Sequence, residues 1–176
     1  MKMSLRLTRS VMAGAAVASL ALVASNAGAT SRPAAVHAHT TGCTGSSTVN
    51  WINTNGNGAA GSIYYELQFT NLSGHSCTFT GYPGVSAVNL AGNQWGPAAA
   101  HVAATAHVIT LLNNASAQAL LKVTNVGVFS TVQCGAVMAA GLRVYAPNSL
   151  IGKIVPFPVW VCSKNLGVLS VSPLTH

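Results

Sequence analysis

Apolar and polar side chains alternate clearly in residues 62–71, which read SIYYELQFTN. One face of an extended chain would carry the larger apolar side chains, Ile63, Tyr65, Leu67 and Phe69. The other face would carry Tyr64, Glu66, Gln68 and Thr70. Because side chains of a β-strand point alternately to its two faces, the pattern predicts a strand with one buried face.

Shorter runs of the same kind follow along the chain, separated by turn signals. They predict strands at 77–80, 85–90, 107–112, 117–124, 141–146, 154–162 and 166–172. Gly81-Tyr82-Pro83-Gly84 is typical of a type II turn, in which proline fixes φ and the next glycine accepts a positive φ. After residue 30 no segment shows a capped helical stripe, although the alanine-rich stretch 98–106 permits a short helical turn. The expected fold is all-β: an antiparallel β-sandwich, immunoglobulin-like or of a similar Greek-key topology.

Pro156 and Pro158 restrict the place of the strand expected at 154–162. Proline has no N–H to donate to a neighbouring strand, so it occurs at sheet edges, strand starts and bulges. We therefore expect this strand to lie at a sheet edge or to be irregular at its start.

The first 29 residues have the features of an export signal. Lys2, Arg6 and Arg9 form a basic start, residues 11–24 are apolar, and Ala27-Gly28-Ala29 fits the small residues before a cleavage site. The apolar run is shorter than the roughly 20 residues of a membrane-spanning helix. We expect a signal peptide at 1–29, a flexible segment at 30–42, a β-sandwich domain at 43–176, and a secreted product without a membrane span after cleavage.

The chain has four cysteines, and all of them follow the expected cleavage site: Cys43, Cys77, Cys134 and Cys162. An even number of cysteines in an exported chain indicates disulfides. Four cysteines allow three pairings, and the sequence alone does not choose among them. We expect Cys43–Cys77 and Cys134–Cys162, because each bridge would then link nearby strands of one half of the domain. A thiolate metal site is not expected, since there is no CxxC pair and no close histidine partner.

Charged side chains are scarce in this sequence. They make up 5% of the residues, against roughly 25% in soluble domains, and Glu66 is the single acidic side chain of the chain. A Ser-His-acid triad needs a carboxylate to orient its histidine, and a glycosidase of the usual kind needs two. We therefore expect a protein that is not an enzyme. Nucleic-acid binding is not expected either, because the cations beyond the leader are scattered: Arg32, Lys122, Arg143, Lys153 and Lys164.

Two motifs suggest chemistry but lack its context. The run from Gly56 to Gly61 (GNGAAG) matches the dinucleotide fingerprint GxGxxG, yet a β-patterned segment follows it where a helix is required. We interpret it as a flexible hairpin loop. Gly74-His75-Ser76 resembles part of a nucleophile elbow, but Thr78 stands where that motif has its second glycine.

Histidines and aromatic residues are the remaining candidates for a site. A metal site based on histidine would require at least three of His75, His101, His107 and His176 to converge. His37 and His39 alone would make a poor closed site. Exposed aromatic side chains could recognise a surface or a carbohydrate, and the candidates for this role are Tyr64, Trp95 and Trp160.

The residues around Cys77 resemble a family of secreted actinobacterial domains of unknown function. The resemblance rests on Cys77-Thr78-Phe79-Thr80-Gly81-Tyr82-Pro83-Gly84, together with Cys43, Gly58-Ala59-Ala60-Gly61, Phe69-Thr70-Asn71, Cys134 and Cys162. It implies an exported β-sandwich, often attached to the envelope through a lipid or a membrane segment, and it assigns no catalytic residues. This chain departs from such members because no cysteine lies near the cleavage site to carry a lipid.

These observations together predict a secreted, non-catalytic β-sandwich module that binds no cofactor. Its role would be binding or structural, at or outside the cell envelope, with a cell-wall polymer or another extracellular protein as partner. The alternative is a histidine-based metal-binding protein or an unrecognised hydrolase.

Overall fold

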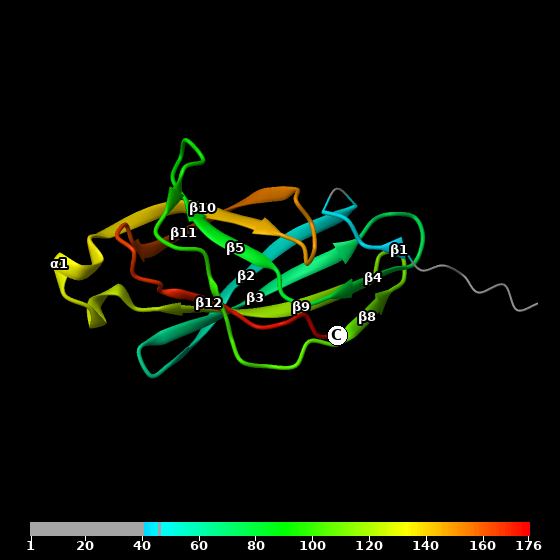
Figure 1. Cartoon of the computed structure of the whole chain (residues 1–176), viewed down its shortest axis with the longest axis horizontal. Helices are drawn as coiled ribbons and strands as arrows, with labels where there is room; N and C mark the ends of the chain where they lie inside the picture. Colours follow the sequence, from blue (N-terminus) through cyan, green and yellow to red (C-terminus); the bar gives the residue numbers. More distant parts are fainter. Residues whose placement is uncertain (1–40, 46) are drawn as a thin grey trace, which may run out of the picture. The chain divides into compact units, whose positions relative to one another are not determined.

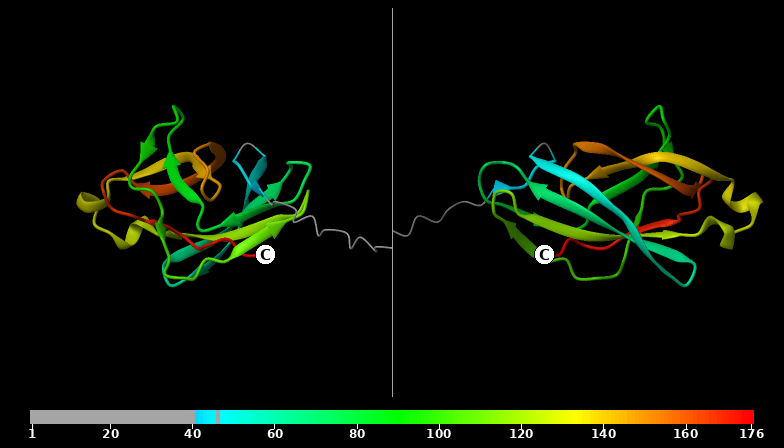
Figure 2. Two further views of the ribbon diagram at one scale, coloured as in Figure 1. Left: turned by 45° about the vertical axis from the view of Figure 1, so that its right-hand side comes forward. Right: turned by 180° about the vertical axis from the view of Figure 1, so that it is seen from behind.

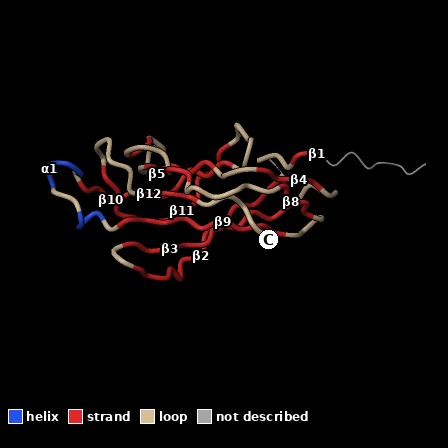
Figure 3. The backbone as a smooth tube through the Cα atoms, turned by 60° about the horizontal axis from the view of Figure 1, so that its bottom comes forward, coloured by secondary structure: helices blue, strands red, loops and turns tan. Residues whose placement is uncertain are grey.

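The computed structural model of the chain describes residues 41–45 and 47–176. The expected signal peptide at 1–29 and most of the segment 30–42 lie outside the described residues. The described part is all-β, as predicted, and helix is confined to the connection between β9 and β10 (Figure 3). No helix within 41–45 and 47–176 is long and apolar enough to cross a membrane.

The strands form three sheets, and the two larger ones pack face to face (Figures 1 and 2). The five-stranded sheet has the order β2 (Thr48–Ala59), β3 (Ser62–Asn71), β9 (Ser116–Thr124), β12 (Leu169–Val171) and β7 (Ala100–His101). The four-stranded sheet has the order β11 (Gly152–Cys162), β10 (Ala136–Tyr145), β5 (Gly84–Val88) and β6 (Gln94–Trp95). The small three-stranded sheet has the order β1 (Thr41–Gly42), β4 (Cys77–Thr80) and β8 (Val108–Leu111). A 3-10 helix, η1 (Val126–Val128), and α1 (Thr131–Cys134) lie between β9 and β10.

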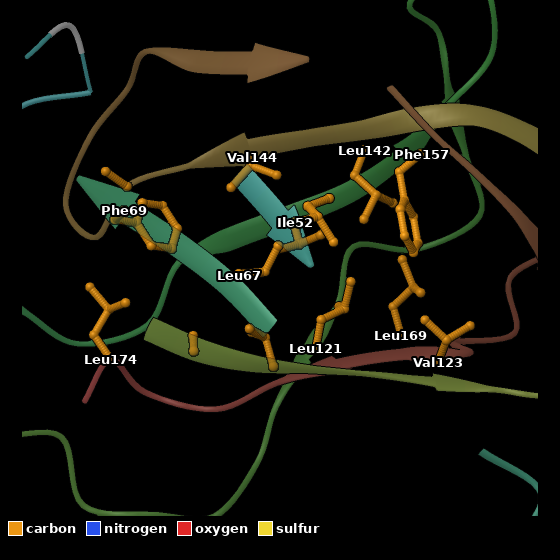
Figure 4. Packing of buried hydrophobic residues seen from close by; sticks show 14 of the residues in the cluster. Ile52, Leu67, Phe69, Leu121, Val123, Leu142, Val144, Phe157, Leu169 and Leu174 are labelled. Carbon is orange, nitrogen blue, oxygen red and sulfur yellow. The ribbon is translucent and has the colours of Figure 1, made fainter. Parts of the chain in front are cut away.

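The core lies between the two larger sheets. Figure 4 shows Leu142, Val144 and Phe157 of one sheet pointing toward side chains of the other, which include Ile52, Leu67, Leu121 and Leu169. The alternation predicted for β3 is confirmed in its second half, where Leu67 and Phe69 are fully buried, whereas Tyr65 is half-buried and Ile63 is exposed. Close packing of this kind makes the burial of apolar area the main stabilising contribution.

All eight predicted strands have a counterpart in the structure, which differs from the expectation in three other respects. β2 had no counterpart among the predictions, because the asparagines and glycines of its second half disfavour strands; pairing with β3 holds it in place. The stretch 98–106 contains β7 and no helical turn. Almost all neighbouring strands are antiparallel, but β1 runs parallel to β4 and β12 runs parallel to β7.

Both predicted disulfides are present, Cys43–Cys77 and Cys134–Cys162. The first joins Cys43, the residue after β1, to the start of β4. β1 itself, Thr41–Gly42, lies inside the segment 30–42 that was expected to be flexible. The second joins the end of α1 to the end of β11. The second bridge thus fastens the one-turn helix α1 to a long strand, whereas the first joins two short strands of the three-stranded sheet.

The Gly-Tyr-Pro-Gly motif does not form the expected type II turn. Gly84 begins β5, and the positive φ of 104° belongs to Gly81. The single O–H of Tyr82 is instead shared between the backbone carbonyls of Val102, at 2.8 Å, and of Ala104, at 2.6 Å. The motif therefore holds the connection between β7 and β8 in place, because the Tyr82 side chain binds two carbonyls of that connection.

Three of the four cations in the described residues bind backbone carbonyl oxygens. Arg143 donates to Gly92 at 2.6 Å. Lys153 donates to Thr48, and Lys164 donates to Val132. With Glu66 as the single acidic side chain, these cations use the backbone as acceptor. Arg143 ties β10 to the loop after β5, Lys153 ties β11 to β2, and Lys164 ties the segment after β11 to α1.

Candidate functional site

A cleft of about 540 Å³ opens at one end of the sandwich core, between the β2–β3 hairpin and β11. This volume lies within the range of roughly 300–1,000 Å³ that small-ligand sites occupy. We call it the hairpin cleft. Its walls are formed by Gly58, Ala59, Ala60, Gly61, Ser62, Ile63, Tyr65, Val123, Thr124, Asn125, Val126, Pro158, Val159 and Trp160. The hairpin, the end of β9 with the start of η1, and β11 each contribute one part.

Two irregular edge strands border the hairpin cleft. In β2, residues 54–56 face the single residue 65 of β3, so β2 carries two extra residues. In β11, residues 157 and 158 face the single residue 140 of β10, so β11 carries one extra residue. Extra residues bend a strand and increase its twist. We infer that the two irregularities turn β2 and β11 apart and leave the end of the core open.

The floor of the hairpin cleft is apolar. Tyr65 packs edge-to-face on Phe157, with ring centroids 4.8 Å apart, and this contact closes the cleft toward the core. Ile63 belongs to the core-facing side of β3, yet 42% of its surface is exposed because nothing fills the space above it. The cleft is thus the unfilled end of the hydrophobic core.

Trp160 stands at the rim of the hairpin cleft with 52% of its surface exposed. It lies opposite the half-exposed Met138 on β10. On the other wall, the Asn125 backbone N–H donates to the Gly61 carbonyl at 2.9 Å and so ties η1 to the hairpin turn. None of the described residues that line the cleft carries a charged side chain.

Comparison with protein families places this arrangement in a known group. The model of the family described as "Domain of unknown function (DUF4232)" matches residues 43–175. The chain belongs to the DUF4232 family. Its DUF4232 domain includes both disulfides and every residue of the hairpin cleft. Comparison with curated proteins and with solved structures finds no match. The expected membership in a family of unknown function is thus confirmed, while the signature and the actinobacterial source stay predictions.

The three aromatic candidates do not share one surface of the DUF4232 domain. Trp160 lines the hairpin cleft. Tyr64 lies in β3 opposite Asn57 and Lys122, on the face turned away from the core. Trp95 is half-buried and packs against the core. The structure therefore brings one of the three into the cleft.

The histidines of the DUF4232 domain do not converge. In the part of the chain that the structure describes, no three His, Cys, Asp or Glu side chains form a group that could hold a metal ion. His101 instead stacks on Tyr82, with ring centroids 4.2 Å apart. His37 and His39 lie outside the described residues. The alternative of a histidine-based metal site therefore gains no support.

The glycine-rich run of the DUF4232 domain is strand and turn. The predicted flexible loop is wrong in this respect, since β2 extends to Ala59 and only two residues separate it from β3. Ala60 and Gly61, with φ of 45° and 75°, form this turn. Two positive φ values at the central residues are typical of the type I′ turn that joins tight hairpins.

Replacing Ala60 with glycine is expected to stabilise the domain. A residue with a Cβ is disfavoured at positive φ by roughly 1–2 kcal/mol, and this exceeds the entropy cost of a glycine. We expect Ala60→Gly to raise the free energy of unfolding by about 0.5–1 kcal/mol in urea denaturation. The control Ala59→Gly, in β2, should lower it by about the same amount. A loss in both variants would contradict the turn assignment.

Proposed function

We propose that this protein is an extracellular, non-catalytic module that binds a cell-wall polymer in the hairpin cleft. The observation that supports the proposal most directly is an open, apolar cleft whose described lining has no charge and whose rim carries the half-exposed Trp160. Two disulfides support an oxidising location outside the cytoplasm.

The chemistry of the hairpin cleft favours an uncharged ligand with an apolar face. Burying a charge without a partner is costly, and the cleft offers no partner for one. A sugar ring has an apolar face that can pack on the indole of Trp160, as aromatic side chains offer large flat contact areas. Thr124 and Asn125 on the opposite wall supply polar groups for hydroxyls. The small side chains of Ala59 and Ala60 leave room for the chain of the polymer.

The position of the acidic group supports binding rather than catalysis. Glu66 lies in β3 opposite Asn53 and Leu120, on the sheet face turned away from the core. The walls of the cleft contain no histidine, cysteine, lysine or carboxylate, and Tyr65 is their single titratable side chain. General acid–base or nucleophilic chemistry needs such groups within reach of a substrate.

Retention on cell-wall material tests the proposal. The disulfide-bonded protein is mixed with purified insoluble cell wall, and the bound fraction is measured after sedimentation. We expect Trp160→Ala to weaken binding at least tenfold, about 1.4 kcal/mol, without changing the unfolding transition, since the side chain is half-exposed. Trp51→Ala is the matched control, because Trp51 has the same exposed fraction, 52%, but lies opposite Gln68 on the outer sheet face.

Two results would refute the assignment. Wild-type protein that stays in the supernatant would show that the cell wall is not the partner. Equal retention of Trp160→Ala and wild type would show that the cleft is not the site, and a loss confined to Trp51→Ala would move the site to the outer face of the five-stranded sheet.

A further inference from the structure

The edge strand β2 contains the dipeptide Asn-Gly twice, as Asn55-Gly56 and as Asn57-Gly58. All four residues are exposed. Glycine has no Cβ to shield its backbone nitrogen or to restrict its torsion angles. That nitrogen can therefore attack the side-chain carbonyl carbon of the preceding asparagine. Whether it does so depends on how the folded strand holds each pair.

Regular pairing with β3 holds the second pair. Asn57 lies opposite Tyr64 and Gly58 lies opposite Ile63, in a register that continues without a shift to the hairpin turn. Strand pairing keeps the residues that it joins in the extended conformation, in which side chains project to the sheet faces. The ladder therefore holds the side chain of Asn57 away from the Gly58 nitrogen.

The first pair lies in the irregular part of β2. Residues 54–56 face the single residue Tyr65, so two of these three have no residue of their own opposite them. The ladder is disrupted at such a point. The Asn55 N–H donates to the side-chain Oδ1 of Asn53 at 3.0 Å, which is a local contact within β2. Rotation of the Asn55 backbone toward the Gly56 nitrogen therefore breaks no regular pair of the ladder.

Packing explains why a glycine stands at position 56. A Cβ at Gly56 would lie 2.4 Å from Cγ2 of Ile63 and 2.6 Å from Cε1 of Tyr65. Both of these side chains line the hairpin cleft, and a larger residue would push them aside. A Cβ at Gly58 would meet nothing within 4 Å. The reactive sequence at Asn55 is thus tied to the shape of the cleft.

We propose that Asn55 is a site of spontaneous deamidation in the folded protein. The Gly56 nitrogen, once it has lost its proton to solvent, attacks Cγ of Asn55. The new N–Cγ bond closes a succinimide ring, and the Cγ–Nδ2 bond breaks to release ammonia. Water then opens the ring. Cleavage of the N–Cγ bond gives aspartate, and cleavage of the bond between the Asn55 carbonyl carbon and the Gly56 nitrogen gives isoaspartate.

Either product adds a carboxylate to a chain whose single acidic side chain is Glu66. Isoaspartate also inserts the side-chain methylene into the backbone of β2, where Gly56 packs on Ile63 and Tyr65. The modification would therefore change the charge and the shape beside the hairpin cleft as the protein ages, and would weaken binding there. This consequence rests on the proposed function. The reaction at Asn55 does not.

Ageing of the disulfide-bonded protein in warm, mildly alkaline buffer tests the proposal without any ligand. Fragmentation mass spectrometry of the peptide that spans β2 measures the deamidated fraction at each asparagine. We expect Asn55 to react at least about fivefold faster than Asn57, the factor that one backbone hydrogen bond supplies. In the reduced chain, unfolded in urea, the two asparagines should react at similar rates because no ladder holds either of them.

Asn55→Gln should remove the fast reaction, because the longer side chain closes a larger and less favourable ring. Asn57→Gln is the matched control, since Asn57 is an exposed asparagine before a glycine in the same strand, and it should leave the fast reaction unchanged. The unfolding transition of each variant shows that it is folded.

Three results would overturn the proposal. The first is a folded protein in which Asn57 reacts as fast as Asn55, or in which both keep their amides. The second is the same ratio of the two rates in the folded and the unfolded chain, since the irregular register would then not be the cause. The third is a fast reaction that persists in Asn55→Gln.

Discussion

Replacing Asn71 with alanine is expected to lower the free energy of unfolding by about 3–5 kcal/mol. Asn71 ends β3 and is fully buried, with 0% of its surface exposed. Its Nδ2 donates to the carbonyls of His75 at 2.8 Å, Leu111 at 3.2 Å and Leu112 at 3.1 Å. Its Oδ1 accepts from the Ser73 N–H at 3.0 Å. Truncation would remove these four hydrogen bonds, each of which contributes about 0.5–1.5 kcal/mol. It would also leave the Ser73 N–H without this acceptor, whereas the Leu112 and His75 carbonyls keep the Ala115 N–H and the Ser73 hydroxyl as donors.

Urea denaturation under non-reducing conditions measures this effect. Asn50→Ala is the control, because Asn50 is half-buried and its Nδ2 makes one longer hydrogen bond, to the Val144 carbonyl at 3.3 Å. We expect the control to lose no more than about 1 kcal/mol. Similar losses in the two variants would mean that Asn71 does not organise the turns beside β3 and β8.

Removing the Cys134–Cys162 disulfide by a double substitution to alanine is expected to cost roughly 3–4 kcal/mol. The bridge spans 28 residues, and in the chain-entropy model a loop of this length contributes a stabilisation of that size. The substitution should also loosen the rim of the hairpin cleft, because Trp160 precedes Cys162 by two residues in β11. Denaturation measures the first effect, and hydrogen exchange of residues near Trp160 measures the second.

The other disulfide supplies the control for the local effect. Cys43–Cys77 spans 34 residues, so its removal should lower stability by a similar amount. It lies at β1 and β4, away from the strands that form the cleft. Faster exchange near Trp160 in both double variants would show that the cleft responds to global stability rather than to the Cys134–Cys162 bridge.

The strands with strong side-chain patterns could be predicted from the sequence. β3 and β4 have the expected bounds, because alternation and turn residues on either side define them. The edge position of β11 followed from Pro156 and Pro158. β2 could not be found, because its Asn and Gly residues lack a strand pattern of their own. Its conformation depends on pairing with β3, which only the folded chain supplies.

The candidate site was less accessible to sequence reasoning. The sequence indicates Trp160 as a candidate because aromatic side chains often take part in recognition. It does not indicate which other residues line the cleft beside Trp160. Ile63 has the pattern of a core residue, and nothing in the pattern shows that the space beside it stays open. The register shifts in β2 and β11 depend on which residues they oppose in neighbouring strands. A strand sequence alone does not contain that information.

The shortage of carboxylates affects how this domain meets acid. Proteins commonly unfold at low pH because ion-paired carboxylates gain protons and lose their partners. Here Arg143, Lys153 and Lys164 bind peptide oxygens, which do not take up protons in mild acid. Glu66 is the single acidic side chain of the chain. The segments that these three cations hold therefore keep their hydrogen bonds at an acidic pH at which the ion pairs of ordinary domains are lost.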